Sequence, residues 1–322
     1  MKERNILIDV AKGLGILLVI WGHTTTPFFN EIYAFHMPFF FVVSGYFFSR
    51  KGSFKNQLSY NIKRIGYPYL LFSVLIYLYY LLFCFIFKLD YNPLGIIKII
   101  PYDGVVSEPL WFLVSLFTIS VFYYFVSKIK NGYIQLLLCL ILFIFSKLHL
   151  IPNWFCISSS MSFLVYYFIG NKLREFHANI FTIFAELESH KKLLYVILSL
   201  VAFCILYYTI DFAGNKYLSI AFSIPIALFG ACCLVSFASL VSNLKKVSSG
   251  LAYIGRNSLT MYAIQLPLME LTRPVSNLFF ERETYLGGMN VFVNLFITII
   301  ATEILCRVFP GILGKNRKMK TQ

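Results

Sequence analysis

The sequence predicts an all-α fold: a polytopic membrane protein with ten transmembrane helices, N-in and C-in. Of its 322 residues, 59% are hydrophobic, 19% are aromatic and only 13% are charged. A soluble globular domain has about 45–50% apolar and about 25% charged residues, so this chain has too few polar residues to build a water-exposed surface. The apolar residues also come in long runs, which short clusters of Lys and Arg separate.

Ten of the apolar runs approach the ~20 residues of helix that cross a ~30 Å hydrocarbon core. We expect spans at 6–25, 34–49, 67–88, 110–127, 133–151, 158–173, 193–210, 217–240, 258–276 and 290–310. The loops between them are short, and neither a linker nor a low-complexity stretch interrupts the chain. Residues 1–322 are therefore expected to form a single integral membrane domain.

The orientation follows from the positive residues, because short cytoplasmic loops are enriched in Lys and Arg. With the N-terminus inside, 20 of the 28 Lys and Arg residues fall on cytoplasmic segments and six on outer ones. An odd number of spans would move the basic tail at 315–320 to the outer face. The bias therefore favours ten spans with both termini in the cytoplasm.

The net charge of +14 does not indicate a nucleic-acid partner, since the positive residues lie between apolar runs as positive-inside topology requires. The seven cysteines lie in or at the ends of apolar runs, and no CxxC is present. Neither a disulfide framework nor a metal site is predicted from that pattern. Membrane lipids are the expected surroundings.

Segment 50–66 is basic, and its apolar residues recur every three or four positions, at Phe54, Leu58, Ile62 and Ile65. This spacing predicts an amphipathic helix on the inner leaflet. Two interpretations stay open. In the first, the basic face only anchors the helix to anionic lipid. In the second, its end at 63–64 also faces a phosphorylated cytoplasmic ligand.

The first two expected spans carry ionisable residues, which are costly inside a membrane and mark functional sites. Asp9, Lys12 and His23 share one stripe of the first helix, since eleven residues bring His23 to within about 20° of Lys12. Asp9 and Lys12 are spaced i,i+3 and can neutralise each other. His36 opens the second span, so both histidines are expected at the outer face of one helical hairpin.

Two roles are open for the pair of Asp9 and Lys12. In the first, the ion pair only orients helices. In the second, Lys12, near the inner face, also holds a phosphate group. His23, about 16 Å further along the helix, would then do acid–base chemistry near the outer face. A long donor with phosphates at one end and its reactive group at the other matches this spacing, and coenzyme A has that shape.

Several stretches together resemble the membrane acyltransferase-3 family, and most closely its fucose 4-O-acetylase-like branch. They are Lys12 and His23 with ten residues between them, FHMPFFFVVSGYFF at 35–48, KRIGYPY at 63–69, PLWFLVSLF at 109–117 and IGRNSLTMYAIQLPL at 254–268. These stretches touch the first four expected helices and the ninth. The hairpin motif is the specific part of the resemblance.

The resemblance implies a ten-helix enzyme of the bacterial inner (cytoplasmic) membrane. Such enzymes move acyl groups, usually acetyl from acetyl-CoA, onto hydroxyls of glycans or lipid-linked sugars. Lys12 stands where the family carries an Arg, and it lacks the bidentate phosphate fork of Arg. His23 stands at the essential histidine. In the ninth helix many relatives carry a His where this chain has Gln265, which can only hydrogen-bond.

The resemblance gives His23 the central catalytic role. As a neutral imidazole it takes the proton of the acceptor hydroxyl, or it is itself acetylated and passes the group on. Activity is therefore expected to fall at acid pH. His36 orients the acceptor or shares the base role, and Glu108 is the acid best placed to orient a histidine.

The candidate binding residues divide between donor and acceptor. Lys12, Lys63 and Arg64 are expected to meet the phosphates of acetyl-CoA. Asp9 and Trp111 are the candidate substrate-binding residues, with Trp111 either stacking on a sugar or belonging to the aromatic belt of the membrane. The donor acts as a substrate, and no metal is expected.

A non-enzymatic transporter of a glycan or lipid-linked intermediate is the alternative, since hydropathy does not separate the two classes. Transporters often show broken helices or repeated halves, and no convincing internal repeat is found here. Another short acyl donor, such as succinyl-CoA, fits the same residues, and the acceptor sugar has no signature in the outer loops.

Overall fold

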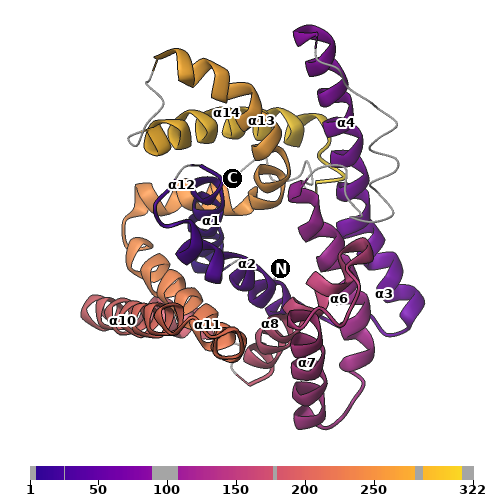
Figure 1. Ribbon diagram of the computed structural model, residues 1–322, viewed down its shortest axis with the longest axis vertical. Helices are drawn as coiled ribbons and strands as arrows, with labels where there is room; N and C mark the ends of the chain where they lie inside the picture. The colour runs from indigo at the N-terminus through magenta and orange to yellow at the C-terminus, as the bar shows by residue number, and fades with distance from the viewer. Residues whose placement is uncertain (1–4, 25, 89–107, 177–179, 280–285, 314–322) are drawn as a thin grey trace. The chain divides into compact units, whose positions relative to one another are not determined.

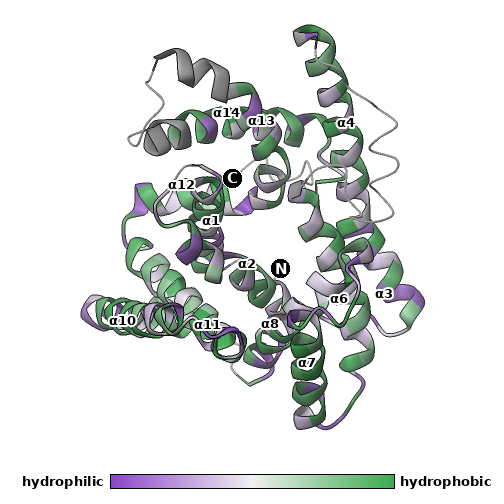
Figure 2. Ribbon diagram, in the orientation of Figure 1, coloured by the Kyte–Doolittle hydropathy of each residue, from purple (hydrophilic) through white to green (hydrophobic). Residues whose placement is uncertain are grey.

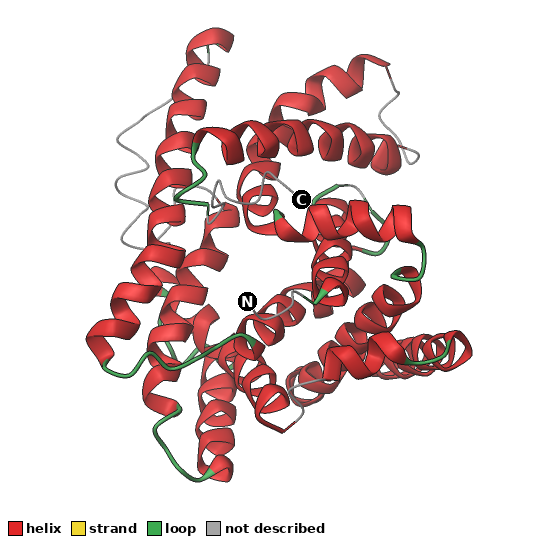
Figure 3. Cartoon of the chain, turned by 180° about the vertical axis from the view of Figure 1, so that it is seen from behind, coloured by secondary structure: helices red, strands yellow, loops and turns green. Residues whose placement is uncertain are grey.

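The computed structural model describes residues 5–24, 26–88, 108–176, 180–279 and 286–313. Within these residues the chain forms helices, short turns and loops, and no strand (Figure 3). The predicted all-α fold is confirmed for this part of the chain. Two compact units share the chain and alternate along the sequence.

The first unit comprises Met1–Phe47, Ile169–Tyr262 and Thr272–Phe296. Its complete helices are α1 (Ile6–Gly22), α2 (Phe29–Tyr46), α9 (Ile180–Glu186), α10 (Ser189–Ala213), α11 (Lys216–Val241) and α12 (Lys245–Arg256). Within this unit α10 lies beside α11, and α1 lies against α12 (Figure 1). Its apolar core gathers side chains from α1, α2, α9, α11 and α12.

The second unit comprises Phe48–Phe168, Ala263–Leu271 and Ile297–Gln322. It contains α3 (Phe54–Asn61), the π-helix η1 (Ile62–Gly66), α4 (Tyr67–Phe87), the short η2 (Glu108–Leu110), α6 (Trp111–Val126), α7 (Gly132–Lys147) and the short η3 (Trp154–Cys156). Three helices contribute residues to both units: α8 (Ile157–Phe176), α13 (Ser258–Phe279) and α14 (Leu286–Val308).

Polar residues between the apolar runs set the helix ends. The side chains of Asn5, Asn131 and Asn215 each accept hydrogen bonds from backbone N–H groups in the first turn of α1, α7 and α11. Such side chains satisfy donors that the helix itself leaves unpaired. Gly214, with φ of +61°, ends α10 in the left-handed conformation that favours glycine.

Three helices among the described residues are long and apolar enough to cross a membrane: Phe54–Ile86, Ser189–Ala213 and Lys216–Val241. Trp111–Val126 and Gly132–Lys147 are apolar but shorter. The hydrophobic colouring covers much of α7, α10 and α11 (Figure 2). The chain is therefore a membrane protein, while the number of ten spans and the N-in, C-in topology stay predictions.

Each expected span overlaps a helix, but the start of the second differs. α2 begins at Phe29, not at residue 34, and it includes Glu31, whose carboxylate accepts a hydrogen bond from the Tyr208 hydroxyl at 2.8 Å. The expectation that His36 opens the helix was wrong, because polar residues ahead of an apolar run can still be helical. His36 lies two turns into α2.

Segment 50–66 is helical from Phe54 onward, and it continues through η1 into α4 as one helix, Phe54–Ile86. Phe54 and Ile62 are exposed, whereas Gln57 and Asn61 on the same helix are buried. Phe54 and Ile62 therefore face outward, as a position at the lipid boundary requires, and the packed side carries Gln57 and Asn61. A separate interfacial helix is not formed.

The helix α12 was not predicted, because its Ser, Gly and Lys content breaks the apolar pattern. It packs against α1 at two glycines, one on each helix. A Cβ at Gly13 would collide with the backbone oxygen of Leu251, and a Cβ at Gly255 would collide with that of Asp9. Glycine is therefore required on both sides for the two backbones to approach this closely.

Replacing Gly255 with Ala is expected to lower the thermal unfolding midpoint in detergent, because the added methyl meets backbone atoms that cannot rotate away. Overpacking of this kind lowers the free energy of unfolding by about 1–3 kcal/mol. Gly250 lies on the same helix, and an added Cβ there has nothing within 4 Å. Gly250→Ala is the matched control and should keep or raise the midpoint. Equal losses in both variants would contradict the close crossing.

Candidate functional site

A tyrosine and two histidines meet where α1 ends and α2 begins its third turn. The Tyr33 hydroxyl lies 3.1 Å from Nδ1 of His23. The Tyr33 ring also packs edge-on against the His36 ring, with centroids 4.8 Å apart. Tyr33 therefore touches both imidazoles, and the histidine pair expected from the sequence lies in one cluster.

Local sequence fixes this arrangement. His23 is the residue that caps α1 at its C-terminal end, and its backbone N–H bonds to carbonyls of the last turn. The preceding residue is Gly22, and a Cβ there would lie only 3.0 Å from the Tyr33 ring. Glycine therefore leaves room for Tyr33 to lie against the end of α1. Phe29 stacks on the Tyr33 ring, with centroids 4.1 Å apart.

The two histidines lie in different environments. His36 is 2% exposed, and its Nδ1 lies 2.7 Å from the backbone oxygen of Ile32. A carbonyl only accepts, so Nδ1 of His36 carries a proton and its Nε2 is the basic nitrogen in the neutral ring. His23 is only partly buried. Of the two, His23 is the one that an incoming substrate reaches more directly.

The hydroxyl of Tyr33 can serve His23 in two ways. If Nδ1 of His23 donates to the Tyr33 oxygen, Nε2 keeps its lone pair and can accept a proton. If the Tyr33 hydroxyl donates to Nδ1, Nε2 carries the hydrogen instead. Only the first arrangement presents Nε2 as a general base.

Asp9 and Lys12 form the ion pair that their spacing predicts. The Lys12 ammonium lies 3.1 Å from the Asp9 carboxylate, and the two side chains are 21% and 6% exposed. The crossing of α1 with α12 buries this turn, because Gly255 sits directly on the Asp9 carbonyl.

The remaining predicted site residues lie in the second unit. Lys63 and Arg64 are exposed on the π-helix η1. Trp111 begins α6 and packs against Phe163, with ring centroids 5.6 Å apart. Glu108 begins η2, but its side chain lies outside the described residues. The site residues are thus divided, with Asp9, Lys12, His23 and His36 in the first unit.

Tyr33 was missed in the sequence. The signal was present, because Tyr33 and His36 are spaced i,i+3 and residues at that spacing share one helix face. The many tyrosines of the chain hid it, since 22 are present. In the part of the chain that the structure describes, no group of three or more His, Cys, Asp or Glu side chains is arranged to hold a metal ion.

Comparison with known proteins gives one match across the chain and two short ones. A family model described as an acyltransferase domain, acyltransferase-3, matches residues 5–308. Nodulation protein NolL of Sinorhizobium fredii is 38% identical over 58 residues, and NolL of Mesorhizobium japonicum is 40% identical over 58 residues. Each match covers 14% of this chain and 16% of the relative. No solved structure matches the chain.

Replacing Asp9 with Asn is expected to lower the thermal unfolding midpoint, because Lys12 then keeps its charge beside a neutral amide. Losing one partner of a buried pair costs about 3–5 kcal/mol, and less where a side chain is partly exposed, as Lys12 is. The double variant Asp9→Asn with Lys12→Gln should recover stability, since no unpaired charge is left.

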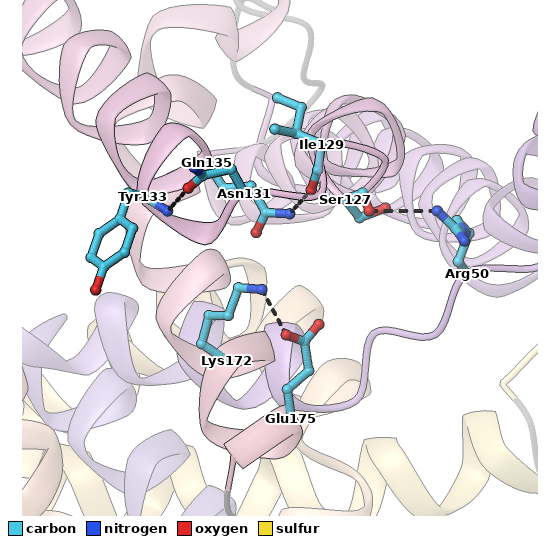
Figure 4. A network of polar contacts seen from close by, with 8 residues as sticks. All are labelled: Arg50, Ser127, Ile129, Asn131, Tyr133, Gln135, Lys172 and Glu175. Atoms are coloured by element: carbon cyan, nitrogen blue, oxygen red, sulfur yellow. Dashed lines mark hydrogen bonds and ion pairs between the residues drawn. The ribbon is translucent and has the colours of Figure 1, made fainter.

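The matched control is Lys172 and Glu175, which form an i,i+3 pair at 2.6 Å with side chains 20% and 50% exposed (Figure 4). Glu175→Gln should change the free energy of unfolding by less than about 1 kcal/mol, because solvent screens the pair. If Asp9→Asn and Glu175→Gln shift the midpoint equally, burial adds nothing to the Asp9 pair.

Proposed function

The chain belongs to the acyltransferase-3 family, and we propose that it moves an acetyl group from cytoplasmic acetyl-CoA to a hydroxyl of a cell-envelope glycan or lipid-linked sugar. The family match over residues 5–308 supports acyl transfer in general. The observation that carries the mechanism is the hydrogen-bond contact of His23 with Tyr33 at the end of α1, beside His36.

In the proposed reaction Nε2 of His23 takes the proton from the acceptor hydroxyl. The acceptor oxygen attacks the thioester carbonyl carbon of acetyl-CoA, and the C–S bond breaks. The CoA sulfur leaves with the proton that His23 gives up. In the alternative, Nε2 of His23 attacks the thioester carbonyl carbon and CoA leaves as its thiolate. The acceptor oxygen then takes the acetyl group from Nε2, and the hydroxyl proton passes to the CoA thiolate. Tyr33 orients His23 in both versions by accepting a hydrogen bond from Nδ1.

The membrane arrangement is part of the proposal. Ten helices with both termini in the cytoplasm would put His23 near the outer face and Lys12 near the inner face. The positive-inside bias and the three long apolar helices support this arrangement. Residues 1–322 would then act as a single domain of a bacterial inner membrane.

The finer assignments are proposals of the same kind. The donor phosphates would meet Lys63 and Arg64, whose side chains are exposed. Trp111 would stack on the acceptor sugar, and Glu108 would orient a histidine. The short matches to nodulation protein NolL cover too little of those proteins to indicate an acceptor.

Replacing His23 with Ala is expected to lower acetyl transfer by about 10²-fold to 10⁴-fold, because the general base is removed. The measurement is transfer of radiolabelled acetyl from acetyl-CoA to envelope glycan in membrane vesicles. His190 is the control, since its side chain is 73% exposed near the start of α10 and lies 3.3 Å from the Glu188 carboxylate. His190→Ala should stay within about twofold of wild type. Normal transfer by His23→Ala would refute the mechanism.

Replacing Tyr33 with Phe tests the orienting role and keeps the ring that packs on His36. Transfer is expected to fall by about tenfold, the usual effect of losing one hydrogen bond to a reacting group. Donation from Nδ1 favours the imidazolium over the neutral ring, so its loss should move the acid limb of the pH–activity profile to lower pH. A shift to higher pH would mean that Tyr33 donates to His23, and an unchanged profile would exclude the contact from catalysis.

A further inference from the structure

The helix Phe54–Ile86 contains one π-turn, and this turn changes which side chains face outward. In η1 the backbone N–H of Tyr67 bonds to the carbonyl of Ile62, five residues earlier. Such a turn holds an extra residue, so each residue advances by less than the ~100° of an α-helix. π-turns inside helices are frequent at functional sites.

The burial pattern shows the consequence of the π-turn. Gln57 and Asn61 are 2% and 1% exposed, and they mark the packed face of α3. On an uninterrupted α-helix Arg64 would fall within about 20° of Gln57 and would face the packed side. Instead Arg64 is exposed, while Ile65 is partly buried. An exposed cation thus lies in the π-turn, next to the packed face of the helix.

Buried hydrogen bonds hold the helix just before the π-turn. The Asn61 side-chain oxygen accepts from the Gln57 amide and from the Ser120 hydroxyl of α6, both at 3.1 Å. The Gln57 oxygen accepts from the backbone N–H of Lys51, also at 3.1 Å. Next to Lys51, Arg50 reaches the Ser127 carbonyl at 3.5 Å (Figure 4). Loop 48–53, α3 and α6 are thus tied together.

These hydrogen bonds place the cations of Lys51 and Arg64 next to one aromatic ring, that of Tyr60. The Lys51 ammonium lies 4.7 Å from the centroid of the Tyr60 ring, and the Arg64 guanidinium lies 5.2 Å from it. The two cations are therefore within about 10 Å of each other. Arg64 also donates to the Tyr60 hydroxyl at 2.8 Å. Among the described residues, neither cation has a carboxylate within ion-pair distance.

Two positive charges this close together repel each other, and an anion that contacts both offsets that repulsion. A phosphate group suits the pair, because the Arg fork binds two of its oxygens and the Lys acts as a point charge. The Tyr60 hydroxyl fixes the guanidinium in advance, so less side-chain freedom is lost on binding.

We propose that Lys51, Tyr60 and Arg64 form a phosphoanion-binding site that the π-turn η1 makes accessible. The site adds Lys51 and Tyr60 to the residues proposed to bind the donor. If the phosphate belongs to acetyl-CoA, the site rests on the proposed function. The headgroup of an anionic lipid offers the same chemistry.

The test uses the full chain in nanodiscs of neutral phosphatidylcholine and measures binding of radiolabelled acetyl-CoA. Lys51→Gln is expected to weaken binding about fivefold to tenfold, the effect of losing one charged contact. Tyr60→Phe keeps the ring and should weaken binding less, because only the hydrogen bond to Arg64 is lost. Lys55 lies on the same basic segment, exposed and four residues along the chain. Lys55→Gln is the charge-matched control and should stay within about twofold.

A second arm measures how much phosphatidylglycerol, relative to phosphatidylcholine, stays bound to the protein after detergent extraction. If Lys51→Gln, but not Lys55→Gln, loses phosphatidylglycerol and keeps acetyl-CoA, the site takes a lipid headgroup. If it loses acetyl-CoA instead, the site takes the donor. Equal effects of the two variants in both arms would overturn the site, because net charge alone would then explain binding.

Acetyl transfer by wild-type vesicles separates this proposal from the function above. Normal wild-type transfer together with equal effects of Lys51→Gln and Lys55→Gln rejects the site and keeps the function. Absent wild-type transfer rejects the function, and the lipid arm then decides on the site. Wild-type protein that binds neither acetyl-CoA nor phosphatidylglycerol selectively also rejects the site.

Discussion

The close approach of α1 to α12 is the constraint on which the first unit depends. In a membrane, helices gain little from burying apolar surface, since lipid is equally apolar, so close packing of small residues holds them together. Gly13 and Gly255 meet this need from opposite sides, each against backbone atoms of the other helix. The crossing buries the turn that carries Asp9, and a buried carboxylate requires a cation. Lys12 provides this cation. The close packing at this end of α1 therefore makes the ion pair necessary.

The other end of α1 follows the same principle with a different result. Gly22 leaves space for the ring of Tyr33, just as Gly15 leaves space for Phe39 and Phe40 of α2. The space at Gly22 is filled by a ring with a hydroxyl, and that hydroxyl reaches His23. A straight helix fixes the separation of its two ends at 1.5 Å per residue. One rigid element thus sets the distance between the ion pair and the histidine cluster.

The sequence predicted the helices well where the physical signal was apolar length. Each expected span overlaps a helix, because side chains that face lipid must be apolar over a whole span. α12 was not predicted, because it packs through glycines, and glycine has no side chain that would contribute to an apolar pattern. The start of α2 was misplaced because Glu31 is polar but helical, with its partner Tyr208 far along the chain. Contacts between distant residues have no signature in the local sequence.

The site was predictable to a similar extent. The i,i+3 spacing of Asp9 and Lys12 predicted their ion pair. The expected helical hairpin predicted that His23 and His36 lie close together. Tyr33 was open to the same reasoning, since it lies one turn before His36. The π-turn was not, because its backbone pattern differs from that of an α-helix only in hydrogen bonds such as the one from the Tyr67 N–H to the Ile62 carbonyl.

A cation that is already paired with a carboxylate binds an anionic donor less well than a cation with no carboxylate nearby. A carboxylate 3.1 Å away offsets most of the charge that Lys12 presents to a ligand. Binding a phosphate there would require Lys12 to leave Asp9, or a buried carboxylate to face a phosphate. Lys51 and Arg64 face no such competition within the described residues, since an aromatic ring is their shared neighbour. Charge alone therefore favours segment 50–64 for the phosphates and leaves Lys12 the task of keeping Asp9 neutralised.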